Sequence, residues 1–364
     1  MEQKHNYIDS SYWDYLASPR SIFIEITNIC NLNCSICANI QDRKNKGVNT
    51  LSKNSFVDYI SKLPIKPKKI IITGGEPFIN PDLYRILLYL ESNAIYFTVY
   101  TNGFLTISNE FLAFLSNSKY LTNISVSLHS HLQVEHEKIT NQPGSFKNTC
   151  TNIGLLTNQH IPVITNTVIT EETPSDINRI INLSRQLGSH LAGFTKFIRH
   201  NEYCTSSLHP PTAKRMKEIA KIINIKNLSN RVDIDCSPYC EVGHFSEACF
   251  AGRTFCSINS FGEIRPCIFS NFSFGNINEQ TFHAIWESDS TLQWRNNCSY
   301  ICKSCDSFAE CLGGCRCTQV KINVQDDKLN STKSVNTNIY ELCFYENLRA
   351  SPLFEIENGR NGLF

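Results

Sequence analysis

Apolar residues follow two alternating periods over roughly the first 225 residues of the chain. Short runs rich in β-branched and aromatic residues lie at 21–27, 68–74, 96–102, 123–129, 162–170 and 191–198. Segments with apolar residues near i, i+3 and i+4 lie at 51–63, 82–92, 109–118, 145–159, 176–188 and 210–224. The runs are typical of strands and the segments of amphipathic helices. Their alternation predicts an α/β fold, a partial, TIM-like (β/α)6 barrel with helices outside a parallel sheet.

The pattern changes after about residue 232. Glycine turns and closely spaced cysteines replace the alternation, and helical periodicity persists mainly at 282–286. Such a region is typical of a domain that folds around metal rather than around apolar bulk. We therefore predict four regions, which are an N-terminal extension (1–20), the barrel (21–232), a cysteine-rich domain (233–345) and a C-terminal tail (346–364).

Charge and hydropathy narrow the list of partners. The chain of 364 residues has a net charge of +1 and 18% charged residues, too little to favour nucleic acid or an anionic membrane surface. The first thirty residues contain no signal-peptide h-region, and no later run is long and apolar enough to cross a bilayer. These features predict a cytoplasmic protein.

The cysteines form two separate groups. Of seventeen, three lie between Cys30 and Cys37, and twelve lie between Cys236 and Cys343. In a chain without an export signal these thiols are expected to stay reduced, and clustered reduced thiols indicate metal binding.

The first group has the spacing C-x3-C-x2-C, formed by Cys30, Cys34 and Cys37. Three thiolates on one loop can bind three irons of a [4Fe–4S] cluster and leave the fourth iron open to a small molecule. The alternatives are buried thiols or a zinc site. Zinc requires a fourth ligand, and no other Cys or His lies within about ten residues of the loop.

Motifs also follow the second and third predicted strands. Gly74-Gly75-Glu76-Pro77 follows the second strand, and Thr101-Asn102-Gly103 ends the third. Ligands of parallel β/α folds bind at the C-terminal ends of the strands, where these motifs and the cysteine loop lie.

The cysteine loop and the Gly74–Pro77 motif together resemble the radical S-adenosylmethionine (SAM) superfamily. The resemblance implies that the open iron binds the amino and carboxylate groups of SAM. An electron from the cluster then cleaves SAM to methionine and a 5′-deoxyadenosyl radical. Glu76 would accept a hydrogen bond from the methionyl ammonium, with the two glycines allowing close backbone approach.

The same resemblance implies further contacts with the cofactor. Ser127 would lie near the ribose, Asn166 would supply a polar contact from the fifth strand, and Ile36 would pack against the adenine. The full set of predicted SAM contacts is Gly74, Gly75, Glu76, Pro77, Asn102, Ser127, Asn166 and Ile36. Many relatives read S-L-D-G where this chain has His129 in the third position, and whether His129 is catalytic or a loop histidine stays open.

Seven C-terminal cysteines reproduce the pattern C-x(9–15)-G-x4-C, C-x2-C-x5-C-x3-C and a final C, which resembles the SPASM domain. The resemblance implies two auxiliary clusters, and hence three [4Fe–4S] clusters in total. The first would use Cys249, Cys267 and Cys315, and the second would use Cys302, Cys305, Cys311 and Cys343.

Cys256 decides whether the first auxiliary cluster is closed. We expect it to be the fourth ligand, because four thiolates per cluster is the usual arrangement. Alternatively, Cys256 is a buried thiol, and an open iron could bind substrate directly. The surplus cysteines are expected to be structural thiols, namely Cys236, Cys240, Cys298 and Cys317.

The resemblance implies an enzyme that matures a ribosomal precursor peptide. The radical would take a side-chain hydrogen, and the product would be an intramolecular C–C, cyclophane or thioether crosslink. Expected partners are the precursor peptide, an external electron donor such as flavodoxin or ferredoxin, and a separate leader-binding protein, since only about twenty residues precede the first strand.

Three alternatives remain. A sulfatase-maturating enzyme is less favoured, because Ile268 follows Cys267 where those enzymes typically carry aspartate. A small-molecule radical dehydrogenase is the second alternative, and a non-catalytic iron–sulfur scaffold is the third.

Overall fold

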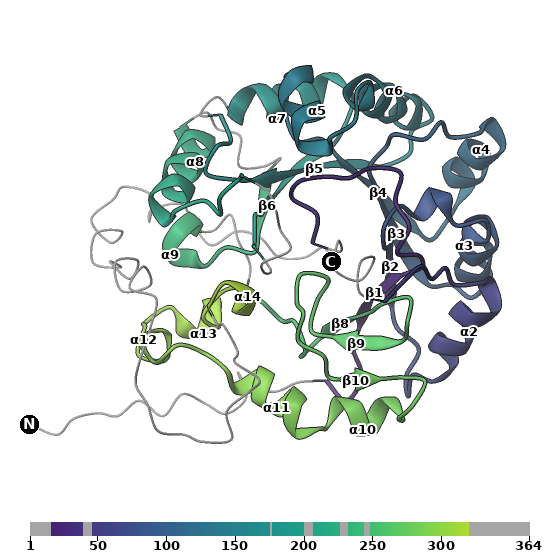
Figure 1. Cartoon of the computed structure of the whole chain (residues 1–364), viewed down its shortest axis with the longest axis vertical. Coiled ribbons are helices and arrows are strands. Elements are labelled where there is room, and N and C mark those ends of the chain that lie inside the picture. Colours follow the sequence, from purple (N-terminus) through teal and green to yellow (C-terminus); the bar gives the residue numbers. More distant parts are fainter. Residues whose placement is uncertain are drawn as a thin grey trace, which may run out of the picture.

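One curved sheet of ten strands organises the protein (Figure 1). The computed structural model describes residues 16–38, 46–174, 177–199, 207–225, 232–243 and 248–319. All six predicted strands are present and pair in parallel in chain order. They are β1 (Ser21–Glu25), β2 (Lys69–Thr73), β3 (Tyr96–Thr101), β4 (Leu121–Ser127), β5 (Val163–Ile169) and β6 (Leu191–Lys196). The predicted partial barrel is confirmed.

Seven helices of the described residues cover the outside of this sheet, as Figure 1 shows. They are α2 (Lys53–Ser61), α3 (Leu83–Ser92), α4 (Asn109–Asn117), α5 (Gln133–Thr140), α6 (Ser145–Asn158), α7 (Ile177–Gln186) and α8 (Ala213–Ile225). Serine N-caps define two of the starts, because Ser52 and Ser108 accept hydrogen bonds from backbone N–H groups three residues on. The apolar period does not predict α5, whose sequence QVEHEKIT is mostly polar.

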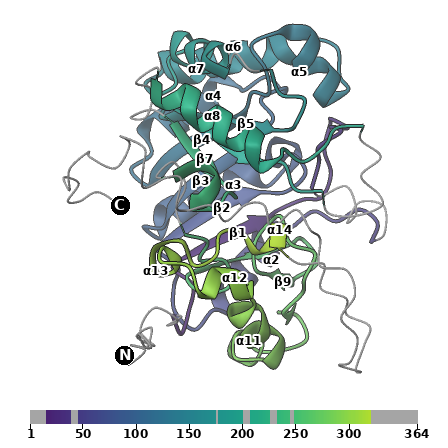
Figure 2. The same cartoon turned by 90° about the vertical axis from the view of Figure 1, so that its left-hand side faces the viewer.

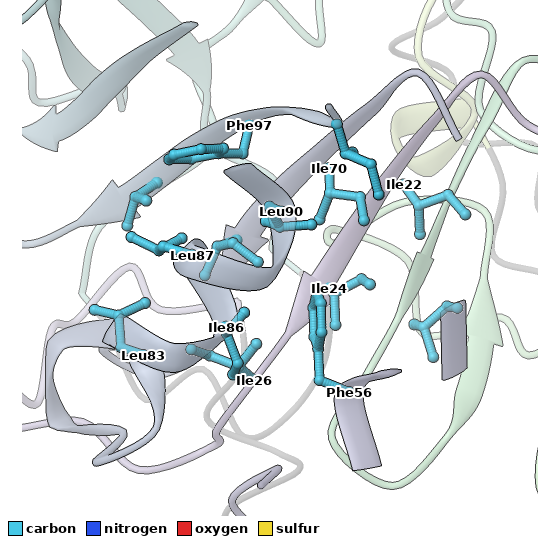
Figure 3. Packing of buried hydrophobic residues seen from close by; sticks show 14 of the residues in the cluster. Ile22, Ile24, Ile26, Phe56, Ile70, Leu83, Ile86, Leu87, Leu90 and Phe97 are labelled. Carbon is cyan, nitrogen blue, oxygen red and sulfur yellow. The ribbon is translucent and has the colours of Figure 1, made fainter. Parts of the chain in front are cut away.

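The main hydrophobic core lies between the sheet and its helices. Alternate residues of β1, including Ile22 and Ile24, face outward and are fully buried with Ile70 of β2 and Leu87 of α3 (Figure 3). The opposite face of each strand points into the barrel. Side chains alternate along each strand, so one side of the sheet packs against the helices. The side chains of the other side are available to form a binding site inside the barrel.

The cysteine-rich part of the chain extends the same sheet. β7 (Val232–Asp235) pairs in parallel with β6, and β8 (Phe255–Ile258) pairs in parallel with β1 on the opposite side. β9 (Glu263–Arg265) and β10 (Gly275–Asn276) add an antiparallel edge. The predicted boundary at 232/233 thus falls within β7, and the two predicted domains share one sheet.

Short helices complete this part of the chain. They are α9 (Tyr239–Val242), α10 (Phe282–Trp286), α11 (Asp289–Asn296), α12 (Tyr300–Lys303), α13 (Phe308–Cys311) and α14 (Arg316–Gln319). Figures 1 and 2 show α12, α13 and α14 close together, next to α11. Within the described ranges, no helix has the length and hydropathy that a membrane span requires.

Candidate active site

The first three cysteines lie on the loop that follows β1. The Cys30, Cys34 and Cys37 side chains are half-buried. The sulfur of Cys30 accepts hydrogen bonds from the Leu32 N–H at 3.4 Å and from Asn102 Nδ2 at 3.6 Å. The loop therefore presents its thiols at the C-terminal edge of the sheet, beside the end of β3.

Helix α5 supports this loop from the outside. Ser35 donates from its backbone N–H to the Ile139 carbonyl at 2.9 Å, and Asn141 Nδ2 donates to the Asn33 carbonyl at 2.8 Å. Asn141 ends α5 in the left-handed region, with φ of 53°, a conformation that asparagine tolerates better than most residues. The helix that the apolar pattern missed thus fixes the middle of the cysteine loop.

The Gly74–Pro77 motif packs directly against the chain that enters the loop. The Gly75 N–H donates to the Thr27 carbonyl, and the Glu76 N–H donates to the Ile29 carbonyl, both at 2.7 Å. A Cβ atom at Gly75 would lie 1.9 Å from the Ile29 oxygen, and one at Gly74 would lie 2.2 Å from the Thr27 oxygen. The backbone approach that the glycines permit is therefore to the chain just before the cysteine loop.

The carboxyl group of Glu76 is fixed by three hydrogen bonds. Thr101 Oγ1 and the Asn102 N–H donate to its two oxygens at 2.8 Å, and the Phe78 N–H donates at 3.1 Å. Pro77 begins a short 3-10 helix, η2 (Pro77–Ile79), which supplies the last of these donors. The Glu76 side chain is 1% exposed, and burial raises its pKa to about 7 against the effect of the hydrogen bonds.

Ser127 and Asn166 lie side by side on the inner face of the barrel. They are direct register partners on β4 and β5, and both are half-buried. Asn166 Oδ1 accepts a hydrogen bond from Thr195 Oγ1 at 3.1 Å. Ile36 is buried next to the third loop cysteine. The structure thus places two of the predicted SAM contacts, Ser127 and Asn166, next to each other. That they bind SAM is a proposal.

A cavity of about 310 Å³ lies beside the loop. Its lining includes Cys34, Cys37 and His129. The His129 side chain is only 7% exposed, and its Nδ1 has no hydrogen-bond partner in the described part of the chain. Burial first, and His136 second, lower the pKa of His129 to about 3, so the ring is neutral. Glu76 is not among the residues that line this cavity.

Five cysteines from the C-terminal part form what we call the first thiol group: Cys236, Cys249, Cys267, Cys315 and Cys317. The sulfurs of Cys267 and Cys317 lie 3.8 Å apart, and the Cys236 thiol hydrogen-bonds to Cys315. Burial is the main cause that raises the pKa of Cys249 to about 12. Two of the five, Cys236 and Cys317, are cysteines that the sequence pattern treats as surplus.

Cys256 lies elsewhere, in contrast to the prediction that it completes the first auxiliary cluster. It is fully buried on β8, opposite Ile22 of β1, and belongs to the hydrophobic core. The strand alternation explains this placement, because Cys256 and Ile258 point to the same, helix-covered side. The structure therefore favours Cys236 or Cys317, which lie beside Cys315, as the fourth ligand, and the assignment stays a proposal.

A second thiol group contains Cys298, Cys302 and Cys311, and Cys305 is counted with it because its backbone N–H donates to the Cys302 carbonyl at 3.1 Å. The thiols of Cys298 and Cys302 share a hydrogen bond, and the Cys311 sulfur accepts one from the Tyr239 N–H at 3.5 Å. Cys298 is a member that the sequence pattern missed, although its spacing of four residues from Cys302 is a possible signal. Cys343, the predicted final ligand, lies outside the described residues.

The donor chemistry of these thiol groups fits iron–sulfur clusters. Among the described residues, no three His, Cys, Asp or Glu side chains converge on a position for one metal ion. A [4Fe–4S] cluster spreads its ligands, because each thiolate binds a different iron. Thiolates are also the soft ligands that iron–sulfur clusters require. The donor sets at all three places fit such clusters.

Comparisons with known proteins agree with this chemistry. Residues 24–184 match the model of the Radical SAM superfamily, and residues 249–306 match that of SPASM, an iron–sulfur cluster-binding domain. The chain is 26% identical over 296 residues to the AdoMet-dependent heme synthase of Methanosarcina barkeri, covering 74% of this chain and 83% of that protein. It is 22% identical over 315 residues to the PqqA peptide cyclase of Gluconobacter oxydans, covering 82% and 86%.

A solved structure has the same fold. Streptococcus suis SuiB bound to its precursor peptide SuiA superposes with a TM-score of 0.71 at 17% identity, over 86% of this chain and 75% of that chain. The fold, the cysteine loop and both family matches define a radical SAM enzyme. Within that superfamily the chain belongs to the proteins with a C-terminal SPASM domain, which implies SAM and iron–sulfur clusters as its cofactors.

The glycine contact can be tested by substitution. We expect Gly75→Ala to lower the free energy of unfolding by about 1–3 kcal/mol, because the new Cβ would overlap the Ile29 carbonyl. Gly154→Ala in α6 is the matched control, since no heavy atom lies within 4 Å of its added Cβ, and it should stabilise the helix by roughly 0.5–1 kcal/mol. Anaerobic denaturant unfolding measures both, and equal effects would contradict the proposed contact.

The two assignments of the fourth ligand make different predictions for iron content. Cys256→Ala should retain the iron and sulfide of the wild-type protein after anaerobic reconstitution, because Cys256 lies in the core. The double variant Cys236→Ala/Cys317→Ala should lose iron equivalent to one cluster, since both thiols border Cys315. A single substitution is insufficient because either thiol could replace the other. Greater iron loss from Cys256→Ala than from the double variant would restore the sequence-based assignment.

Proposed function

We propose that this chain is a peptide maturase that introduces an intramolecular crosslink into a ribosomal precursor peptide. In this proposal the enzyme carries three [4Fe–4S] clusters, one on the Cys30 loop and one on each thiol group. The substrate class is supported by similarity to the PqqA peptide cyclase and by a fold shared with SuiB, which was crystallised with its precursor peptide.

The residues around Glu76 would hold and orient SAM. The bound cluster and SAM supply a 5′-deoxyadenosyl radical. Thr101 and the Asn102 N–H fix the Glu76 carboxyl, so that it can accept a hydrogen bond from the methionyl ammonium. Ser127 and Asn166 are adjacent polar groups on the inner barrel face, where they could bind the ribose. The side chains of Glu76 and Asn166 are already held by hydrogen bonds within the fold.

The observation that carries the proposal is the surplus of thiols around Cys315. Five cysteines are available there for the four positions of one cluster, so the first auxiliary cluster can be closed by protein ligands. A closed cluster has no iron for direct bonding to substrate and is suited to electron transfer. Crosslinking requires such an acceptor, because the substrate loses one hydrogen atom to the radical and then one electron and one proton.

The proposal also names the other partners. An external donor such as flavodoxin or ferredoxin would supply the electron that cleaves SAM, and a separate protein would bind the leader of the precursor. Reduced thiols are kept in reducing compartments, so we propose the cytoplasm as the location of the enzyme.

Anaerobic turnover with a co-expressed precursor peptide tests the function. The reconstituted full chain, SAM and reductant should release 5′-deoxyadenosine, and the peptide should lose the mass of two hydrogen atoms, with fragmentation locating a crosslink. An unchanged peptide together with consumption of an iron porphyrin precursor would favour the second candidate, a haem synthase, to which the chain is 26% identical. Loss of the same mass at one serine, or replacement of one cysteine thiol by an aldehyde oxygen, would indicate formylglycine instead.

The raised pKa of Glu76 predicts how SAM affinity depends on pH. Because burial raises this pKa to about 7, the carboxyl is neutral below that value and must lose a proton to bind the ammonium. SAM affinity should therefore fall as pH decreases below about 7, by up to roughly tenfold per pH unit. Anaerobic equilibrium dialysis measures it, and Glu76→Gln should bind SAM weakly and without this slope. An identical slope in the variant would contradict the assignment.

A further inference from the structure

The side-chain amide of Asn31 has a buried donor that no acceptor satisfies in the described part of the chain. Asn31 directly follows the first loop cysteine, and its Oδ1 lies 3.8 Å from the Cys30 sulfur. Its Nδ2 is buried and makes no hydrogen bond with the described residues. Buried side-chain donors are nearly always paired, because burial removes the water that would otherwise accept from them. An orphaned donor here therefore indicates an acceptor that binds beside Cys30.

The hydrogen bonds of Asn102 determine which atom of the Asn31 amide is the orphan. The oxygen and nitrogen of an amide side chain are distinguished by their partners. The Phe104 N–H can only donate, so the Asn102 atom that accepts from it at 2.9 Å is Oδ1. Asn102 Nδ2 therefore faces Asn31 and donates to its Oδ1 at 2.8 Å. The other atom of the Asn31 amide is thus Nδ2, and only an acceptor can satisfy it.

Asn102 also contacts both parts of the proposed cofactor site. Its Nδ2 donates to the Cys30 sulfur at 3.6 Å, and its backbone N–H donates to Glu76 Oε2 at 2.8 Å. Its carbonyl accepts a hydrogen bond from Thr149 Oγ1 at 3.0 Å, which holds the residue against α6. Asn102 is therefore fixed on several sides, and the fold sets the orientation of the Asn31 amide before any cofactor binds.

The sulfur atoms of the N-terminal cluster are the acceptors that match this position. Cys30, Cys34 and Cys37 would bind its irons, and the Asn31 amide already lies beside the first of these ligands. Binding to iron removes the thiol protons and makes the cysteine sulfurs better acceptors. Hydrogen bonds to the sulfurs are one of the factors that set the reduction potential of a cluster. The carboxylate of SAM is a second anionic acceptor, and the experiment below separates the two.

We propose that Asn31 Nδ2 donates a hydrogen bond to a sulfur of the N-terminal cluster and raises its reduction potential, with Asn102 as the positioning residue. The inference rests on the proposed function in one respect, that a [4Fe–4S] cluster binds to the Cys30 loop. The cluster accepts one electron from the external donor and becomes more negative. A fixed donor stabilises the reduced form more than the oxidised form, which makes the cluster easier to reduce.

Redox titration of the full chain tests the inference without SAM or peptide. The N-terminal cluster supplies the part of the electron paramagnetic resonance signal that Cys30→Ala/Cys34→Ala/Cys37→Ala lacks. Asn31→Leu replaces the amide with an apolar side chain of similar size. It should shift the oxidation equilibrium of this cluster about tenfold toward the oxidised form, which is about 59 mV for one electron. Asn33→Leu is the matched control, because Asn33 lies on the same loop but is exposed to water. It should shift the equilibrium less than about twofold.

An unchanged potential in Asn31→Leu, with full iron content, would overturn the inference. Anaerobic equilibrium dialysis with SAM then separates the acceptors, because weaker SAM binding at an unchanged potential would assign the donor to the SAM carboxylate instead.

If Asn31→Leu loses iron, Asn31→Ala decides, since its smaller side chain removes the donor and cannot clash with a cluster. A retained cluster with a lower potential supports the inference. An unchanged potential, or loss of iron in this variant too, overturns it. A wild-type chain without the N-terminal signal would overturn the proposed cluster as well, whereas a wild-type signal that neither variant shifts overturns the inference alone.

Discussion

The main-chain contact between the Gly74–Glu76 segment and the chain before Cys30 is the constraint on which the site depends. Two hydrogen bonds of 2.7 Å hold the segments so close that only glycine fits at two successive positions. This contact joins the ends of β1 and β2, sets where the cysteine loop leaves the sheet, and directs Glu76 toward Thr101 and Asn102. The same main-chain contact therefore positions both the cluster ligands and Glu76, the proposed acceptor of the SAM ammonium group.

The cysteine-rich part is joined to the barrel by more than a linker. Strand β8 continues the sheet beside β1, and β7 does so beside β6. A buried ion pair adds to this, because Lys196 at the end of β6 donates to both carboxyl oxygens of Glu241 at 2.7 Å. Removal of either partner would destabilise the fold, because the other charge would stay buried and uncompensated. Glu241 follows Cys240 directly, so the pair ties the start of the cysteine-rich part to the mouth of the barrel.

Much of the fold could be predicted from the sequence because local periodicity and turn chemistry agree over the first six strands. The cysteine spacing likewise indicated the chemistry of the loop, since three thiols in eight residues are a local feature. Helix α5 was missed because its apolar face is weak and its role is to support the loop. Strands β7 and β8 were missed because four residues are too few to establish a period.

The choice between Cys256 and Cys236 could not be made from spacing. Both cysteines lie close to the motif cysteines in the sequence, and they differ only in their positions in the folded structure. Cys256 points into the hydrophobic core, as Ile258 does, whereas Cys236 follows β7 and lies beside Cys315. The spacing of the cysteines indicated that they are cluster ligands. It did not indicate which cysteines share one cluster, because these lie far apart in the sequence.

The most direct measurement addresses the open iron of the N-terminal cluster. A full-length variant that keeps Cys30, Cys34 and Cys37 but lacks the cysteines of both thiol groups should bind a single reduced [4Fe–4S] cluster under anaerobic conditions. Addition of SAM should change its electron paramagnetic resonance spectrum, because the amino and carboxylate groups bind the vacant iron. A spectrum that SAM leaves unchanged, or a loop that holds zinc, would contradict the assignment of this chain as a radical SAM enzyme.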